Sequence, residues 1–129
     1  MRIPFASVLV KDQEQALRFY TEKLGFTKKR DIPMGGPRWL TVVSPAAPDG
    51  VELVLEPMGY PFAVTWQREL YAAGVPATAF QVDDIQAEYQ RLSALGVTFA
   101  APPKAMGPTI GAKLDDTCGN WIQIFQLAK

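Results

Sequence analysis

VLVKDQEQALRFYTEKLGF, residues 8–26, begins as an alternating apolar strand, passes through an aspartate into an amphipathic helix, and ends in Leu-Gly-Phe. The segment FQVDDIQAEYQRLSALGV, residues 80–97, follows the same plan about 72 residues later. Two copies of one supersecondary unit in a short chain indicate an internal duplication. We therefore expect the two halves of the chain to share one local fold.

The helix in each copy has clear start and stop signals. Asp12 is a natural N-cap for the first helix and Gly25 a natural stop, while Asp83 or Asp84 caps the second helix and Gly96 ends it. Apolar residues recur at helical spacing between these signals. They are Leu17, Tyr20 and Leu24 in the first helix, and Ile85, Tyr89, Leu92 and Leu95 in the second.

Short apolar runs separated by Pro- and Gly-rich turns follow each helix and predict three more strands per half. The expected strands are residues 27–31, 38–43 and 51–56 in the first half, and 98–100, 110–114 and 121–126 in the second. Each half then has the order βαβββ, with one repeat at about 1–58, a linking helix at about 62–73 and the other repeat at about 75–127. The predicted fold is a single α+β domain, residues 1–129, whose paired modules form a curved eight-stranded mixed sheet with helices outside and a concave cleft inside.

Composition excludes several classes of function. Thirteen basic and thirteen acidic residues give no net charge and form no long run of one sign, so we expect neither a nucleic-acid nor a membrane partner. One cysteine, Cys118, cannot form an internal disulfide, and the start MRIPFASVLV lacks the features of an export signal, so we expect a cytoplasmic protein. Histidine is absent, which removes the commonest general base and metal ligand.

Five segments together resemble the vicinal oxygen chelate superfamily, which includes glyoxalase I, bleomycin resistance proteins, fosfomycin resistance enzymes and extradiol dioxygenases. They are VLVKDQEQALRFYTEKLGF, RWLTVVSP, PDGVELVLEP, AFQVDDIQAEYQRLSALGV and DDTCGNWIQIFQ, and they cover most of the chain in the family's order. The resemblance implies the fold described above. It does not by itself imply a reaction, because function depends on the site that a fold carries.

The resemblance also implies where a metal would be held. Metal-dependent members use histidines and glutamates at four positions, which in this sequence are Phe5, Glu52, Ala77 and Gln123. Only Glu52 keeps a charged, ligand-competent side chain, whereas zinc and iron sites need about three protein ligands. We therefore expect no metal and no other cofactor, and we assign no catalytic residue.

The same strand phases predict the lining of the concave face. Alternation places Phe5, Ser7, Val54, Glu56, Ala79, Trp121 and Phe125 beside Glu52, Ala77 and Gln123. Such a cleft suits a small, partly aromatic or cationic organic molecule. A simpler explanation stays open for each residue, because Glu52 and Glu56 can face water and Trp121 and Phe125 can fill a packing or dimer contact.

Three hypotheses for function follow. The first is metal-independent binding of a small organic ligand in a homodimer, as the resemblance to bleomycin resistance proteins implies. The second is a lyase, isomerase or dioxygenase of the same superfamily with a remodelled metal site that uses Glu52. The third is a protein interaction module that presents its concave surface to a partner chain.

Overall fold

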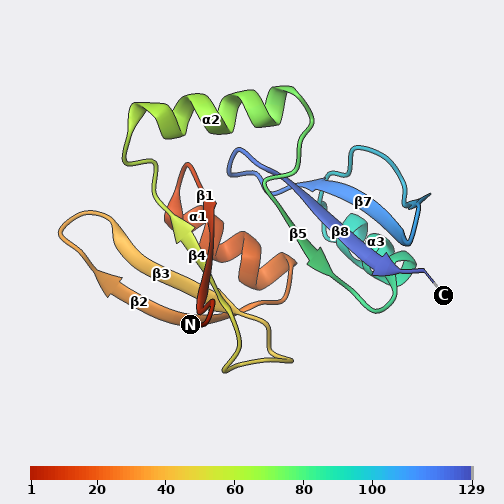
Figure 1. The fold of residues 1–129 in the computed structure, drawn as a ribbon, viewed down its shortest axis with the longest axis horizontal. Coiled ribbons are helices and arrows are strands. Elements are labelled where there is room, and N and C mark those ends of the chain that lie inside the picture. The colour runs from red at the N-terminus through yellow and green to blue at the C-terminus, as the bar shows by residue number, and fades with distance from the viewer. Residues whose placement is uncertain (129) are drawn as a thin grey trace.

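The chain consists of two βαβββ modules joined by a helix (Figure 1), in a computed structural model that describes residues 1–128. The linking helix is α2, Pro61–Ala72. The first module contains β1 (Phe5–Leu9), α1 (Gln13–Arg18), η1 (Phe19–Lys23), β2 (Thr27–Pro33), β3 (Arg38–Val43) and β4 (Glu52–Glu56). The second contains β5 (Thr78–Gln81), α3 (Ile85–Ala94), β6 (Lys104–Met106), β7 (Thr109–Asp115) and β8 (Trp121–Leu127).

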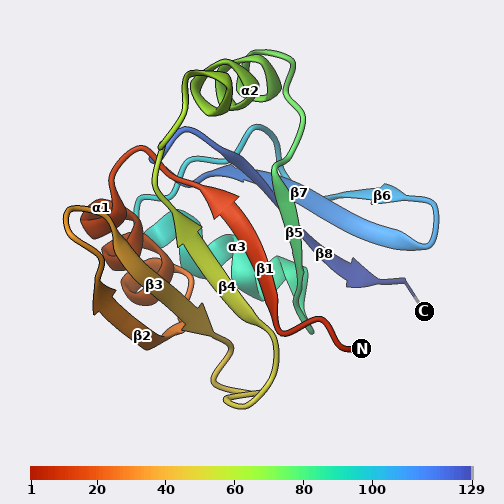
Figure 2. The same ribbon diagram turned by 60° about the vertical axis from the view of Figure 1, so that its left-hand side comes forward.

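The strands form two four-stranded mixed sheets of matching topology. Their orders are β1-β4-β3-β2 and β5-β8-β7-β6, and in each sheet the first pair is parallel and the others are antiparallel. In Figure 2 the sheets lie next to each other with β1 and β5 at the junction, and α1 and α3 both lie behind the strands. The predicted α+β class of paired βαβββ modules is therefore confirmed. Within residues 1–128, no helix has the length and apolar character needed to cross a bilayer.

The two helices begin at the predicted aspartates. The Asp12 carboxylate accepts a hydrogen bond from the backbone N–H of Gln15 at 2.9 Å. Asp84, rather than Asp83, accepts one from the backbone N–H of Ala87 at 3.0 Å. The first helix does not stay α-helical, because it continues from Phe19 as the π-helical segment η1. The wider turn brings two consecutive residues, Phe19 and Tyr20, into the buried face.

One predicted strand is wrong. Residues 98–100 do not form a strand and contribute only an isolated bridge between Phe99 and Leu114. The edge strand of this sheet is instead β6, which pairs with β7 across a turn that contains Gly107. Pro102 and Pro103 explain the shift, because two consecutive residues without an amide N–H cannot continue a strand ladder.

A single apolar core lies between the helices and the sheets. It includes alternate residues of the strands, such as Val8 and Val10 of the first module and Ile122 and Ile124 of the second, together with helix residues such as Leu92. All five are at most 3% exposed, and they belong to one contiguous cluster. The modules therefore share a core on the helix side, which leaves the opposite face of both sheets without a covering layer.

A buried carboxylate connects the two modules at this core. Asp116, which is fully buried, accepts hydrogen bonds from the Tyr20 hydroxyl at 2.6 Å and from the Asn120 side chain at 2.8 Å. Its other oxygen accepts the amides of Cys118 and Asn120 at 2.8 and 3.0 Å. Burial raises the pKa of Asp116 despite these four donors, and burial beside Asp116 also raises the pKa of Tyr20.

The linking helix joins the same network. The Gln67 amide group of α2 donates to the carbonyl oxygens of Leu9 at 2.8 Å and of Cys118 at 3.1 Å, and Asn120 also donates to Leu9, at 2.7 Å. Gly119 lies against Gln67 with a φ of +99°, so a side chain there would both strain the backbone and collide with Gln67. Module one, α2 and module two are thus fixed to one another by buried polar contacts.

Two tyrosines allow the contribution of this junction to the free energy of unfolding to be measured. Tyr20 and Tyr71 each donate to an aspartate at 2.6 Å, but the first pair is buried and the second is exposed. Tyr20→Phe should lower the free energy of unfolding by about 1.5–3 kcal/mol, whereas Tyr71→Phe should cost less than about 1 kcal/mol. Urea unfolding of both variants at neutral pH measures the difference. Equal losses of unfolding free energy would show that the buried pair stabilises the fold no more than the exposed pair.

Candidate functional site

The face of the sheets that no helix covers carries the residues expected in the cleft. We call it the open face. Strand register places Phe5 opposite Glu52, Ser7 opposite Val54, and Leu9 opposite Glu56 in the first sheet. In the second sheet Gln123 lies opposite Ala79, and Phe125 opposite Gln81. Because paired residues of neighbouring strands point to the same face, each set of predicted residues shares one surface within its own module.

Glu52 is not a free carboxylate. It is 7% exposed, and its Oε1 accepts hydrogen bonds from the Thr41 hydroxyl at 2.7 Å and from Arg30 Nε at 3.0 Å. These contacts, with that to Thr41 the larger, hold the pKa of Glu52 below its ordinary value. Arg30, which comes from β2 and is about half exposed, neutralises the charge that the sequence placed at this position.

The four positions at which related proteins hold a metal do not suit an ion here. Phe5 and Ala77 have no donor atom, Gln123 offers a neutral amide, and Glu52 is paired with a guanidinium that would repel a cation. Among residues 1–128, no group of three or more Cys, Asp or Glu side chains lies in an arrangement that could hold a metal. The donor set therefore does not fit the metal that the family resemblance implies at these positions.

The first module contributes aromatic and polar surface to the open face. Phe5 is 40% exposed and packs edge-on against Trp39, with ring centroids 5.3 Å apart. The Ser7 hydroxyl lies 3.3 Å from Glu56 Oε1 and donates to it. Glu56 differs from Glu52 because no Lys or Arg among residues 1–128 lies within salt-bridge distance of it.

The second module contributes a flatter surface. Ala77 and Ala79 are exposed and offer only methyl groups. The Gln123 amide folds across Gly111 and donates to Met106 Sδ at 3.7 Å, and a side chain at position 111 would occupy the place of that amide. Phe125 is half-buried and lies opposite Gly111 on the neighbouring strand.

Trp121 has a structural task on this face. Its ring stacks on Tyr71 of α2, with centroids 5.1 Å apart and planes at 9°, and its indole N–H donates to the Tyr71 carbonyl at 3.2 Å. The ammonium of Lys113 lies 5.8 Å from the centre of the Trp121 ring. Trp121 therefore attaches the C-terminal end of α2 to the second sheet, which is close to the packing alternative that the sequence left open.

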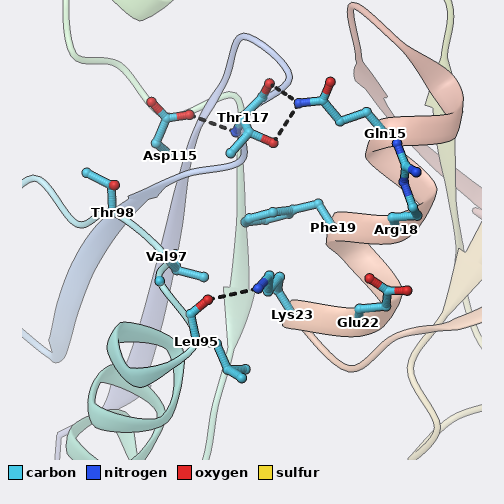
Figure 3. A pocket seen from close by; sticks show the side chains of 11 residues that line it. Gln15, Arg18, Phe19, Glu22, Lys23, Leu95, Val97, Thr98, Asp115 and Thr117 are labelled. Carbon is cyan, nitrogen blue, oxygen red and sulfur yellow. Dashed lines mark hydrogen bonds between the residues drawn. The ribbon is translucent and has the colours of Figure 1, made fainter.

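Several surface pockets lie away from the centre of the open face. A pocket of about 370 Å³ lies between α1 and the segment that follows α3, where Gln15 donates to Thr117 and Lys23 to the Leu95 carbonyl (Figure 3). These hydrogen bonds join the two modules on their helix side, which indicates an internal junction. Neither this pocket nor four others of about 350 to 580 Å³ includes Phe5, Glu52, Ala77, Gln123 or Phe125.

Sequence reasoning missed two features of this surface. Arg30 was assigned only to a strand, because alternation predicts the face of a long side chain but not the carboxylate that it reaches. Phe62 and Trp66 fall in the predicted linking helix and Tyr60 lies just before it, yet all three are 62–71% exposed beside the end of β4. A signal for the second feature was present, since three aromatic residues within seven positions exceed the needs of a linker.

Cys118 has no features of a nucleophile. It is 1% exposed, and burial beside Asp116 raises the pKa of its thiol to about 12. A thiolate is the reactive form of cysteine, so this side chain is inert at neutral pH.

Comparison with known proteins gives one consistent result. Residues 2–124 match the family model described as the glyoxalase/bleomycin resistance protein/dioxygenase superfamily. The protein YurT of Bacillus subtilis is 55% identical over 126 residues, which cover 98% of this chain and 99% of YurT. The crystal structure of UcmS2 has a TM-score of 0.83 at 32% identity and covers 97% of each chain.

A second solved structure, that of TnmS3, an antibiotic binding protein from Streptomyces sp. CB03234, has a TM-score of 0.79 at 30% identity. The match covers 99% of this chain and 97% of TnmS3. The resemblance stated from the five sequence segments is thereby confirmed. The chain belongs to the glyoxalase/bleomycin resistance protein/dioxygenase superfamily.

Proposed function

We propose that this protein is a cytoplasmic, metal-independent binding protein that holds a small, partly aromatic or cationic organic molecule against its open face. The observation that carries the proposal is the combination of Glu52 neutralised by Arg30 with aromatic side chains left exposed on the same surface. A planar organic ligand gains from burying such rings, and it needs no ion to be held. Phe5 and Phe125 supply ring contacts, and Ser7, Glu56 and Gln123 supply polar ones.

The known relatives support this kind of function. TnmS3, which resembles this chain over nearly its whole length, is described as an antibiotic binding protein. The proposal transfers only the general activity, the capture of an organic molecule, and leaves the identity of the ligand open. Glu52 acts in it as a positioning residue that fixes Arg30 at the edge of the surface.

A homodimer is part of the proposal. Phe5 and Ala77 are exposed, and a ligand on an uncovered sheet face would bury only one of its own sides. Binding sites for small molecules usually bury most of the ligand surface. A second copy placed over the open face would close the cleft and would also cover the exposed Phe5.

The competing enzyme hypothesis makes a direct prediction about metal. After incubation with Zn²⁺, Mn²⁺ or Ni²⁺ and removal of free ion, elemental analysis should find far less than one equivalent bound, because the positions of Phe5, Ala77 and Gln123 lack charged donors. Glu52→Gln is the matched control and should leave this small amount unchanged. Stoichiometric, chelator-sensitive metal that disappears in Glu52→Gln would favour a remodelled metalloenzyme.

Ligand binding is tested by thermal-shift screening against planar aromatic and cationic compounds, followed by titration calorimetry of hits. Phe5→Ala and Phe125→Ala should each lower by about tenfold the affinity for a compound that binds, since each removes a ring contact worth about 1.4 kcal/mol. Tyr89→Ala, on α3 behind the sheet, is the control and should retain the affinity. A compound that binds all three variants equally would have its site elsewhere on the protein. If no compound binds and a protein partner is found, the protein interaction module is favoured.

The positioning role of Glu52 predicts a pH dependence. Because the folded protein lowers the pKa of Glu52, its stabilising effect is complete above the ordinary carboxyl value of 4.5 and is lost as the pH falls through the lowered value. Glu52→Gln should thus lose stability relative to the native protein at pH 7, and the loss should shrink below about pH 4.5. Urea unfolding between pH 3 and 7 measures this difference in unfolding free energy, with Glu69→Gln at an exposed position as the control. A loss independent of pH would contradict the pairing of the Glu52 carboxylate with Thr41 and Arg30.

A further inference from the structure

An aromatic pocket lies where the open face meets the N-terminal end of α2. Its volume is about 430 Å³, which is within the range of small-molecule sites. Its floor comes from the ends of β1 and β4, and one wall comes from α2 and the turn before it. The residues that line it are Leu9, Glu56, Pro57, Gly59, Tyr60, Phe62, Ala63 and Trp66.

Three aromatic side chains dominate this pocket and are not used in the core. Tyr60, Phe62 and Trp66 are 64%, 71% and 62% exposed. Tyr60 and Phe62 stack in parallel, with centroids 5.0 Å apart and planes at 8°, and Phe62 and Trp66 are four residues apart on one side of the helix. The faces of aromatic rings attract cations as well as apolar groups.

The pocket also contains a carboxylate without a cationic partner. Glu56 is partly buried, and its one side-chain hydrogen bond within residues 1–128 is the 3.3 Å bond from Ser7. Glu52, four residues earlier on the same strand face, is paired with Arg30. The open face therefore has an end where Glu52 is neutralised and an end where Glu56 has no cationic partner within residues 1–128, and Tyr60, Phe62 and Trp66 lie at the second end.

The start of α2 does not turn this pocket into an anion site. Pro61 has no amide N–H, and the amides of Ala63 and Val64 donate to the Tyr60 carbonyl at 3.0 and 3.4 Å. The amide donors that usually attract anions at a helix N-terminus are thus largely missing or occupied. Charge complementarity at this end of the open face favours a cation.

We propose that the aromatic pocket binds the ammonium group of an organic cation, with Glu56 as the counter-charge and Tyr60, Phe62 and Trp66 around its alkyl or aryl substituents. This inference rests on the proposed function and extends it, because it assigns a chemical class, an organic cation with apolar substituents, and a place for the charged group. A desolvated cation over aromatic faces and beside a carboxylate gains from both contacts at once.

The test uses the full chain and phenyltrimethylammonium as the probe, with tert-butylbenzene as its neutral isostere. The chain has three tryptophans, so a proton–nitrogen NMR spectrum resolves three indole signals, and Trp66→Phe identifies the one from the pocket. The cation should shift the Trp66 signal, and the isostere should bind at least about tenfold more weakly. Glu56→Gln and Phe62→Ala should each weaken binding of the cation by about tenfold. Glu69→Gln makes the same charge change on α2, outside the pocket, and should leave the affinity unchanged.

The failures of this inference and of the proposed function are distinguishable. If the Trp121 signal shifts, the Trp66 signal does not, and Phe125→Ala abolishes binding, the ligand sits on the open face and the pocket assignment is overturned. If the neutral isostere binds as well as the cation and Glu56→Gln keeps the affinity, the cation assignment is overturned. If Trp66 responds while Phe5→Ala and Phe125→Ala change nothing, the pocket assignment stands without the larger cleft.

A second copy of the chain is the alternative occupant of this surface. Sedimentation velocity of Phe62→Ala, run beside the NMR titration, detects that case. A dimer that becomes a monomer in Phe62→Ala while the cation affinity stays unchanged would identify the aromatic residues as a self-association surface and would overturn the proposal. Unchanged association with weakened cation binding supports it.

Discussion

The buried Asp116 carboxylate constrains the whole molecule. An isolated carboxylate in an apolar core would be strongly unfavourable, so the fold must bring donors to it from several directions. Tyr20 comes from the first module, while Asn120 and the amide of Cys118 come from the turn that carries Asp116 itself. Gln67 of α2 then donates to the Cys118 carbonyl in the same turn. The Tyr20 hydrogen bond crosses from one module to the other, so satisfying this buried charge helps to fix the relative positions of the modules.

The position of the modules determines what the open face can do. Their helices share a core, which leaves one face of both sheets free, and the chemistry of that face depends on how its charges are paired. Arg30 neutralises Glu52, whereas within residues 1–128 Glu56 has only Ser7 as a hydrogen-bond donor. A surface with one neutralised acid, one free acid and several rings is suited to recognition of an organic molecule. Among the residues that the structure describes, it lacks the group of converging donors that metal-dependent catalysis requires.

Much of the fold was accessible from sequence because local rules agree with tertiary structure in each repeat. Aspartate caps, glycine stops and strand alternation identified both modules. The family resemblance fixed the strand phases at Glu52 and Gln123, and alternation from these phases placed Phe5 with Glu52 and Ala79 with Gln123. The errors arose where contacts distant in sequence decide the outcome. The strand expected at residues 98–100 yields to β6 because of two prolines, and no pattern shows that Arg30 reaches Glu52 or that Asp116 lies inside.

The linking helix shows why an apparently structural element can carry recognition residues. Only Ala63 and Gln67 of α2 are buried, and the helix is attached by the Gln67 hydrogen bonds and by the stacking of Tyr71 on Trp121. Polar contacts and one aromatic pair thus attach α2 to the sheets, whereas α3 is attached by the packing of an apolar face. Because the core does not use Phe62 and Trp66, their exposure has no structural benefit within one chain, and it costs solubility. Burial of these rings by a bound molecule would remove that cost, which supports the proposed site where the N-terminal end of α2 meets the open face.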